Sequence, residues 1–313
     1  MPNMEKIVTI TLNPSIDKST VVKNLVPEKK LRCAEPKFEP GGGGVNVSRA
    51  IKKLGGSSSA IYFAGGYSGS FFTQLLDTEG IESIVVPIAE YTRENMIVVD
   101  ESSNLQYRFG MPGPAVSPSE IESFFNILEN AGKADYLVAS GSLPQGVNDD
   151  FFTRLAKVSR RMNAKLIVDT SGEPLRKAID EGVYMIKPNL GELSMLNGVH
   201  ELHDGDITEA ARNIIDKGGA EVIVVSMGAS GATLVTRDEV ITSPSPTVRK
   251  KSTVGAGDTM VAGMVLYMAE NKCWKDVLQY GVAAGTATTM NSGTELCKKA
   301  DVERLFSCLK KYG

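Results

Sequence analysis

The chain has 313 residues, of which 42% are hydrophobic, so it can bury a full core and is not an intrinsically disordered protein. Its net charge is −3 and no long block of lysine and arginine occurs, so we expect neither nucleic acid nor an anionic membrane as a partner. The start of the chain lacks a signal pattern and no apolar run could cross a bilayer, which predicts a cytoplasmic protein with a small-molecule substrate.

Short β-branched runs alternate with amphipathic segments along most of the chain. The runs predict buried strands at 7–10, 136–139, 166–169, 183–186 and 222–225. Helices are predicted at 117–130, 149–162 and 208–218, each with Pro, Gly or Asp near an edge. The alternation predicts an α/β fold with an open, mostly parallel sheet, whose ligands gather at the carboxyl ends of the strands.

An aspartate, Asp17, follows the first predicted strand closely, at the edge of the sheet where ligands are expected. It could hold the hydroxyl groups of a sugar, or it could be an ordinary turn residue after Pro14. Its position alone leaves both interpretations open.

Two pairs of segments break the alternation of strands and helices. Residues 18–23 with 31–38, and 92–99 with 105–109, alternate polar and apolar side chains and have no helix between them. They predict a small β sheet, from about 17–40 and 90–110, that stands off the main body as a lid. Because a thin sheet with one apolar face is marginal by itself, we expect it to pair with a second copy in a homodimer.

Four consecutive glycines at 41–44 lead directly into a predicted helix that continues to Ile51 and Leu54. Bare backbone lets a sugar lie against the chain, and Asn46 can both donate to and accept from neighbouring hydroxyl groups. A flexible linker is the alternative. Linkers seldom run directly into a helix with a polar residue in its first turn, so the pattern favours binding.

Two motifs follow predicted strands in the second half of the chain. Asn189 and Glu192 lie three apart and could hold Mg²⁺ through its waters, although the same pair resembles a capping box. The small residues of 226–231 could let the phosphates or ribose of a nucleotide approach the backbone, or they could form a hairpin turn into 232–235.

The segment Thr253-Val-Gly-Ala-Gly-Asp258 precedes an apolar, proline-free run that predicts a buried helix. The free amide groups and the positive dipole end of such a helix can hold a phosphate or the charge that develops in a transition state. Asp258 in the same turn could accept a hydroxyl proton during phosphoryl transfer to an alcohol. The alternative is a simple helix cap, but the second glycine cluster at 41–44 favours catalysis.

Other well-known signatures are missing. Neither a Gly-x-x-x-x-Gly-Lys-[Ser/Thr] loop nor a Gly-x-Gly-x-x-Gly motif after a strand occurs, which argues against P-loop enzymes and dinucleotide oxidoreductases. The two histidines, His200 and His203, lie in a polar stretch that predicts a solvated loop rather than a zinc site. The four cysteines form no Cys-x-x-Cys pair, so we expect reduced packing residues.

The glycine segment 41–46, Asn189-x-x-Glu192 and 253–258 together resemble the ribokinase-like (PfkB) sugar kinases, in order and spacing over nearly the whole chain. Within that family, the segments 31–33, 38–44, 106–113 and 140–144 are most similar to the minor 6-phosphofructokinases. The resemblance implies one three-layer α/β domain over 1–313 with helices on both faces of the sheet. It also implies ATP-dependent transfer of a phosphoryl group to fructose 6-phosphate, and a lid sheet that clasps a second subunit.

The resemblance implies a role for each matching position. Asp258 would take the proton from the C1 hydroxyl of the sugar, and the amides of Gly255, Ala256 and Gly257 would form the anion hole. The sugar would be held by Asp17, Gly42, Gly43, Asn46 and Ser142, and MgATP by Lys187, Asn189, Glu192 and the turn with Ser226, Gly228 and Gly231. A monovalent cation such as K⁺ would bind Ser252, Val254, Asn291 and Gly293.

The charge of the predicted lid favours a phosphorylated sugar independently. A plain hexose needs only hydroxyl partners, whereas the lid carries Lys30, Arg32, Arg93 and Arg108, and arginine is suited to bidentate phosphate binding. We expect Arg93 at least to contact the 6-phosphate. The alternative is that these side chains only solvate a thin sheet.

Other functions stay open at this stage. Tagatose-6-phosphate kinase and 1-phosphofructokinase are the nearest alternatives, because their substrates differ only in one hydroxyl or in the place of the phosphate. A non-catalytic sugar-phosphate sensor is disfavoured because Asp258 and the Gly-Ala-Gly loop are present, and a nucleoside kinase because the lid is basic.

Overall fold

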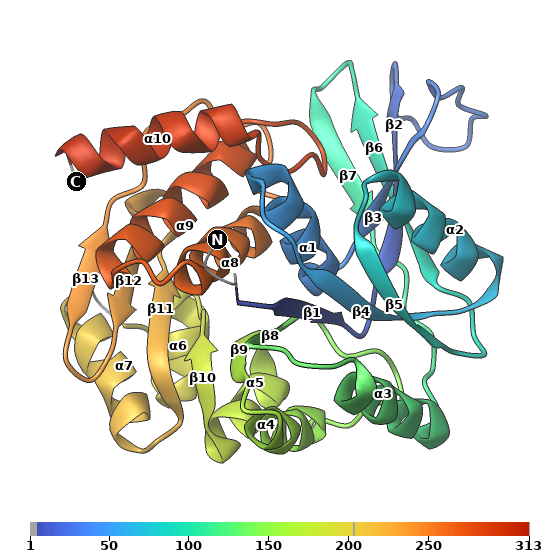
Figure 1. Ribbon diagram of the computed structural model, residues 1–313. Helices are drawn as coiled ribbons and strands as arrows, with labels where there is room; N and C mark the ends of the chain where they lie inside the picture. Colours follow the sequence, from blue (N-terminus) through green and yellow to red (C-terminus); the bar gives the residue numbers. More distant parts are fainter. Residues whose placement is uncertain (1–4, 203, 313) are drawn as a thin grey trace.

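The computed structural model describes residues 5–202 and 204–312, and a nine-stranded sheet runs through this part of the chain (Figure 1). The strand order is β13-β12-β11-β10-β9-β8-β1-β4-β5, parallel from β11 to β5 and antiparallel at β12 and β13. This confirms the mostly parallel α/β prediction and all five predicted strands. The bounds are β1 (Ile7–Thr11), β4 (Ser59–Ala64), β5 (Glu82–Pro87), β8 (Tyr136–Ser140), β9 (Lys165–Asp169), β10 (Val183–Ile186), β11 (Ala220–Ser226), β12 (Ala232–Val235) and β13 (Val240–Ser243).

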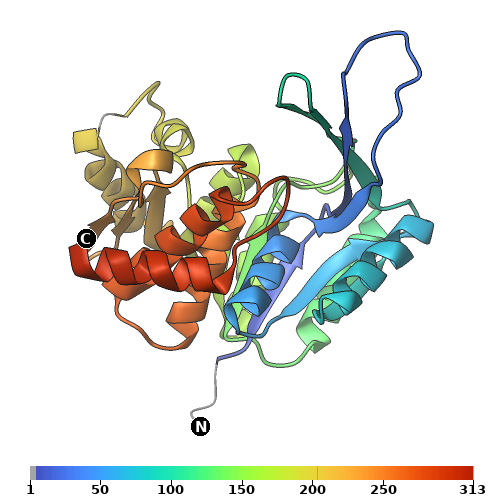
Figure 2. The same cartoon turned by 90° about the horizontal axis from the view of Figure 1, so that it is seen from above.

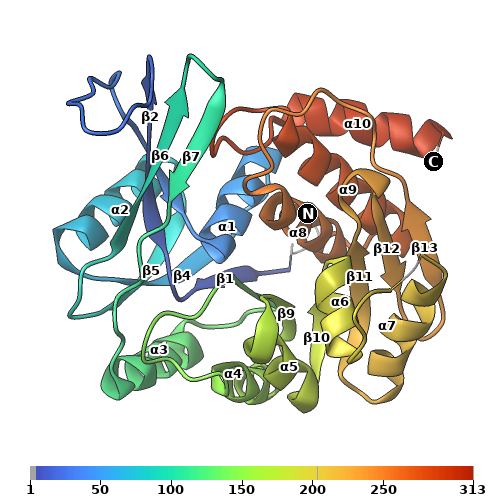
Figure 3. The ribbon, with the colours of Figure 1, turned by 180° about the vertical axis from the view of Figure 1, so that it is seen from behind.

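Helices cover both faces of this sheet (Figures 1 and 3). One face carries α1 (Gly43–Leu54), α2 (Gly66–Thr78), α8 (Ala256–Ala269), α9 (Trp274–Thr289) and α10 (Lys299–Tyr312). The other carries α3 (Pro118–Asn130), α4 (Phe151–Arg161), α5 (Gly172–Glu181), α6 (Leu190–Leu196) and α7 (Ile207–Asp216), with short 3₁₀ turns at Asp204–Asp206 and Gly228–Ser230. The predicted helices correspond to α3, α4 and α7.

The strands are apolar on both sides because each feeds two cores. Leu166 and Val168 of β9 join the cluster under α3–α7, whereas Ile167 between them joins the cluster under α1, α8 and α9. All five residues of β1 and of β8 are buried for the same reason. Continuous apolar runs were therefore a reliable signal in this sheet.

A second sheet of four strands, in the order β3-β2-β6-β7, stands off the main body (Figure 2). We call it the lid; its strands are β2 (Ser15–Val22), β3 (Lys37–Gly41), β6 (Arg93–Asp100) and β7 (Leu105–Phe109). The predicted strand at 31–38 is wrong, because β3 begins only at Lys37. Residues 23–36 form a projecting loop whose single bridge joins Cys33 to Val22, and its mostly exposed side chains give a strand nothing to pack against.

The carboxyl ends of five neighbouring parallel strands meet at one edge of the main sheet. β1, β8, β9, β10 and β11 end there at Thr11, Ser140, Asp169, Ile186 and Ser226. The chain moves from β1 outward to β4 and β5 and then returns to β8 on the other side of β1. Ligands of open α/β sheets bind at such a change of direction.

Three expectations from the sequence can be compared with local structure. Within the described ranges, no helix has the length and apolar character needed to span a membrane. The cysteines are free, but only Cys297 is buried; Cys33, Cys273 and Cys308 are exposed, so the packing role predicted for them is wrong. His200 is exposed, as expected, whereas His203 and residues 1–4 lie outside the described residues.

Candidate active site

Asp258 lies in the first turn of α8, at the edge where the strands end. Gly255 allows this entry because its φ of 70° is left-handed, and no side chain of a described residue caps the helix start. Asp258 Oδ2 accepts a hydrogen bond from Asn46 Nδ2 at 3.0 Å, and its Oδ1 accepts one from Ser140 Oγ at 3.2 Å. Asp258 is intermediate in exposure, and its carboxylate lies between Asn46 of α1 and Ser140 at the end of β8.

The surroundings of Asp258 make it a better proton acceptor than a free aspartate. Burial, and then the nearby charge of Asp169, raise the pKa of Asp258 to about 6, against the hydrogen bonds of Asn46 and Ser140 and the charge of Lys187. A carboxyl group with this pKa is still ionised at pH 7 and accepts a proton more readily than an ordinary one.

The backbone before α8 leaves amide groups for an anion. The Ala256 amide lies 3.4 Å from the Thr253 carbonyl oxygen, a long contact that a ligand oxygen can replace. Gly257 lies next to the Lys187 side chain, since a Cβ there would lie 3.5 Å from Lys187 Nζ, an ordinary van der Waals distance. The helix dipole adds positive potential at the same place.

The glycine cluster lies directly beside Asp258. Gly42 has a φ of 113°, and a Cβ on Gly43 would lie 2.3 Å from Ser140 Oγ, so neither position accommodates a larger residue. Both precede Asn46, which already contacts Asp258. The structure therefore brings the predicted sugar-binding loop to the predicted base.

Asp17 lies within strand β2, so its interpretation as a turn residue is wrong. Its Oδ1 accepts hydrogen bonds from Ser15 Oγ and Asn95 Nδ2, both at 2.9 Å. A Cβ on Gly41 would lie 2.6 Å from Asp17 Oδ2, which places the carboxylate against the glycine cluster. Asp17 thus belongs to the lid and lies against the glycine cluster at 41–44.

The other predicted sugar-phosphate residues are distributed unevenly. Arg93 lies at the base of the lid and donates to the carbonyl oxygens of Asn13, Met111 and Pro14 at 3.0, 3.3 and 3.4 Å. Ser142 Oγ accepts from Asn13 Nδ2 at 3.2 Å, so it is close to Arg93. Lys30 and Arg32 belong to the projecting loop 23–36, which stands out from the main body (Figure 2). Arg108 borders the segment 250–254 instead.

A buried lysine, Lys187, lies near Gly257 at the start of α8. Lys187 is 8% exposed, and its Nζ lies 3.2 Å from Asp169 Oδ1. Burial alone would lower the pKa of Lys187, but the charges of Asp169, Asp258 and Glu192 raise it above its ordinary value. The ammonium group therefore stays charged beside the segment 253–257, which we call the anion loop.

Asn189 and Glu192 form a complete capping box at the start of α6. Asn189 Oδ1 accepts from the Glu192 amide at 2.9 Å, and Glu192 Oε2 accepts from the Asn189 amide at 2.8 Å. The structural interpretation of this motif is thus correct. It is compatible with a binding role, because Glu192 is partly exposed and its charge reaches Lys187.

A cavity of about 330 Å³ opens next to the anion loop. The turn 226–231 forms one wall and also connects β11 to β12 as a hairpin, so the hairpin interpretation of this segment is confirmed and its contact with a nucleotide stays a prediction. Gly231 is required there, since a Cβ would lie 2.0 Å from the Ser243 carbonyl oxygen. The remaining lining is Ser245, Pro246, Thr247, Val248, Lys250, Thr253, Ala256, Gly257, Met260, Val282, Gly285, Thr286 and Thr289.

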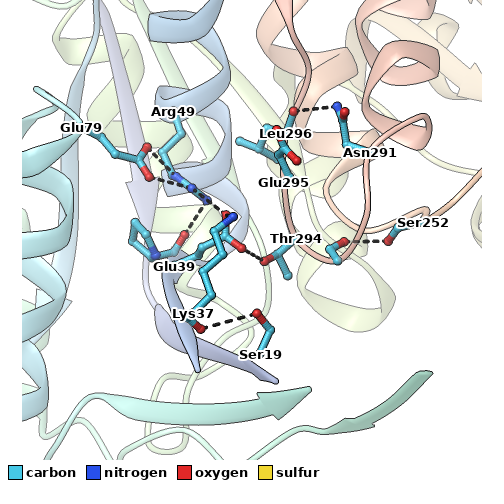
Figure 4. A network of polar contacts seen from close by, with 12 residues as sticks. Ser19, Lys37, Glu39, Arg49, Glu79, Ser252, Asn291, Thr294, Glu295 and Leu296 are labelled. Atoms are coloured by element: carbon cyan, nitrogen blue, oxygen red, sulfur yellow. Dashed lines mark hydrogen bonds and ion pairs between the residues drawn. The ribbon is translucent and has the colours of Figure 1, made fainter. Parts of the chain in front are cut away.

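The residues predicted to hold a monovalent cation meet next to the anion loop. Ser252 Oγ donates to the Gly293 carbonyl oxygen at 2.7 Å and accepts from the Val254 amide at 3.3 Å. Asn291 is 6% exposed, and its side-chain amide donates to the Leu296 carbonyl oxygen at 3.0 Å (Figure 4). The segments 252–254 and 291–296 thus lie side by side and bring several carbonyl and hydroxyl oxygens together.

Sequence reasoning missed several polar residues of the site. Ser140 and Asp169 end strands at the ligand edge, and that position could have identified both. Asn95 and the cavity wall 245–248 gave no local signal, because their contacts depend on how distant segments pack.

A mostly parallel sheet covered by helices on both faces, a carboxylate at an uncapped helix start by the carboxyl ends of its strands, and a cavity next to that helix start match a phosphotransferase of the ribokinase-like class. The chain belongs to the PfkB family: the profile of the pfkB family carbohydrate kinases matches residues 4–301. The resemblance predicted from the motifs is therefore confirmed.

Individual relatives match the whole chain. The ATP-dependent 6-phosphofructokinase isozyme 2 of Escherichia coli is 41% identical over 98% of this chain and 100% of its own length. A 1-phosphofructokinase of Borreliella burgdorferi is 34% identical over 96% of each chain. Crystal structures of Escherichia coli phosphofructokinase-2 in complex with potassium and with fructose-6-phosphate superpose with TM-scores of 0.94 and 0.92, at 41% and 40% identity, covering 98% of this chain and 100% of theirs.

Proposed function

We propose that the chain is an ATP-dependent 6-phosphofructokinase, which transfers the γ-phosphoryl group of ATP to the C1 hydroxyl of fructose 6-phosphate. The observation that carries this proposal is the setting of Asp258. Asn46 and Ser140 hold its carboxylate, whereas Lys187 forms its ion pair with Asp169 instead. The similarity to the Escherichia coli 6-phosphofructokinase over the full length supports the substrate.

Each side of the cleft has a task in this reaction. Asp258 accepts the proton of the sugar hydroxyl as the hydroxyl oxygen attacks the γ-phosphorus. The amides of Gly255, Ala256 and Gly257 stabilise the charge on the transferred group, and Lys187 adds a fixed positive charge nearby. Closure of the lid excludes water, which would otherwise accept the phosphoryl group.

The residues present fit MgATP and a monovalent cation. No cluster of three or more acidic, His or Cys side chains occurs among the described residues, which suits a Mg²⁺ ion held mainly by phosphates and, through water, by Glu192. Bound Mg²⁺ would neutralise phosphate charge. The cavity lined by Ser226, Gly228 and Gly231 would hold the nucleotide. Asn189 is bridged to Ser226 and Lys187 lies near Gly257, so both would be close to its phosphates. K⁺ suits the oxygen groups of Ser252, Val254, Asn291 and Gly293.

Arg93 is the best-supported ligand of the sugar phosphate. A guanidinium group has five N–H donors, and three of its nitrogens each donate once to backbone carbonyls. One N–H remains on each terminal nitrogen, which suits bidentate phosphate binding. Asp17, Gly42, Gly43, Asn46 and Ser142 would hold the sugar itself, while the contacts of Lys30, Arg32 and Arg108 with substrate stay predictions.

Fructose 1-phosphate and tagatose 6-phosphate are the alternative acceptors. The 34% identity to a 1-phosphofructokinase is the reason to test fructose 1-phosphate. A substrate panel with purified protein and MgATP separates them, with formation of ADP as the measurement. We expect fructose 6-phosphate to give the highest kcat/KM, and a higher value for either alternative would contradict the proposal.

Asp258→Asn should lower kcat by roughly two to four orders of magnitude if proton acceptance is its role.

We further propose that the protein is one kinase domain over 1–313 that forms a homodimer through its lid. The side chains of Leu105, Tyr107 and Phe109 on β7 support this, because they are 57%, 38% and 47% exposed in the single chain. The cytoplasmic location stays a prediction from the sequence.

A further inference from the structure

A buried polar network joins three segments that are far apart in the chain (Figure 4). Glu39 of β3 accepts a hydrogen bond from Thr294 Oγ1, which lies in the loop between α9 and α10. Its Oε1 lies 3.1 Å from Lys37 Nζ and 3.7 Å from Arg49 Nη2 of α1. Glu39 and Thr294 are 7% and 5% exposed, so water does not replace their contact.

On the sugar side, the network ends at the glycine loop and at Asn46. Arg49 is 3% exposed and forms a bidentate pair with Glu79 at 2.8 and 2.7 Å. Its Nη1 donates to the Pro40 carbonyl oxygen at 2.8 Å and lies 3.5 Å from Asn46 Oδ1. The positive charge therefore faces the oxygen of the Asn46 amide, which leaves the Asn46 nitrogen to face Asp258.

On the nucleotide side, Thr294 belongs to the loop that supports the anion loop. The carbonyl oxygen of Gly293, the residue before it, accepts from Ser252 Oγ. Leu296 lies beneath Gly255, since a Cβ on Gly255 would lie 2.6 Å from Leu296 Cδ2. A shift of the loop 291–296 would therefore move the segment 252–257.

The charge on Glu39 makes its contact with Thr294 specific. Burial alone would raise the pKa of Glu39, but the hydrogen bond from Thr294 and the charges of Lys37 and Arg49 hold it below its ordinary value. Glu39 is thus an ionised, buried acceptor, and the loss of a donor is costly for such a group. Arg49 already has a full partner in Glu79, so the distinct contribution of Glu39 and Thr294 is to link the lid base to the loop 291–296.

We propose that Thr294 is a positioning residue that couples the two substrate sites through Glu39. Neither residue touches the proposed substrates. The hydroxyl of Thr294 ties the loop 291–296, which supports the anion loop, to β3, which leads into the glycine cluster at 41–44. An ordered conformation at one substrate site therefore favours an ordered conformation at the other. This rests on the proposed two-substrate kinase function, and such a coupling must act equally in both directions.

The test measures the coupling itself. We would titrate a non-hydrolysable ATP analogue with Mg²⁺ by calorimetry, without and with a saturating amount of whichever sugar phosphate the substrate panel shows to be phosphorylated. In the unmodified enzyme we expect the sugar phosphate to tighten binding of the analogue about fivefold or more. Thr294→Val should remove most of this factor while changing each separate Kd less than about twofold, and Thr294→Ser should restore it.

Thr233→Val is a matched control. Thr233 is 6% exposed, and its hydroxyl is hydrogen-bonded to Thr242 at 3.0 Å in the β12–β13 hairpin. We expect it to keep the coupling factor. Full coupling in Thr294→Val, or a change of both separate Kd values with the factor unchanged, would show a purely structural role. A factor of one in the unmodified enzyme would overturn the coupling whichever sugar phosphate is the acceptor, whereas an acceptor other than fructose 6-phosphate would overturn only the proposed substrate.

Discussion

At the scale of single residues, the carboxyl group of Asp258 is tuned by opposing neighbours. Burial and the charge of Asp169 raise its pKa, while Asn46, Lys187 and Ser140 lower it, and the result is about 6. Two charged groups act on it directly: Asp169 ends β9, and Lys187 follows β10. Glu192 in α6 acts on Lys187 instead. The balance keeps the carboxyl group ionised at neutral pH, as the proposed base requires.

This pKa predicts the acid side of the pH profile. We expect kcat to fall about tenfold per pH unit below about 6, because protonated Asp258 cannot accept the hydroxyl proton. Ser140→Ala removes a donor to the ionised form, so the midpoint should move to higher pH by up to about one unit. Profiles are measured at saturating substrates.

A matched variant separates this effect from titration of the substrate's own phosphate. Ser142 is hydrogen-bonded to Asn13 and not to Asp258. Ser142→Ala should therefore leave the midpoint of the acid limb of kcat unchanged, whatever its effect on sugar binding. Equal midpoints for Ser140→Ala and the unmodified enzyme would mean that another group controls the acid limb.

At the scale of elements, predictability followed burial. The strands of the main sheet were predictable because residues such as Ile167 and Val168 feed cores on both faces. The alternation of polar and apolar side chains at 31–38 led to a wrong strand prediction, because such a pattern can also occur in an exposed loop that pairs with no other strand. Contacts such as Asn95 with Asp17 were not predictable, because they depend on the parallel register of β2 with β6 across 78 residues.

Arg93, the first residue of β6, provides a test of whether the lid binds the phosphate of the sugar. Burial lowers the pKa of Arg93, against the raising effect of Asp17, because carbonyl groups rather than water surround the guanidinium. Arg93→Ala should raise KM for fructose 6-phosphate about a hundredfold, as the loss of two charge-assisted hydrogen bonds costs roughly 3 kcal/mol. KM for ATP should change only a few-fold.

The control for this variant is Arg237→Ala, in the exposed turn between β12 and β13. It removes the same charge far from the cleft and should leave both KM values unchanged. An unaltered KM for fructose 6-phosphate in Arg93→Ala would reject the phosphate contact and leave Arg93 as a residue that only ties β6 to the carbonyl groups of Asn13 and Pro14.

At the scale of the whole molecule, the two faces of the lid differ in character. Asp17 and Asn95 are paired neighbours, so they share the face that carries Arg108, which is paired with Ile97 two residues further along. The opposite face carries Met96 and Phe109, with Tyr107 and Leu105 along the same strand. The polar face borders the cleft, whereas the apolar face has large exposed side chains that a second lid could cover.

A dimer through this apolar face predicts a mass of twice the 33.5 kDa of one chain in light scattering at micromolar concentration. Phe109→Asp places a charge on this face, and a buried unpaired charge is costly, so this variant should be monomeric. Met195→Asp is the control, because Met195 is also a large exposed side chain, 58% exposed, but lies in α6 away from the lid. It should keep the mass of the unmodified protein. A monomer mass for the unmodified protein would remove the dimer, and a dimeric Phe109→Asp would place the interface elsewhere.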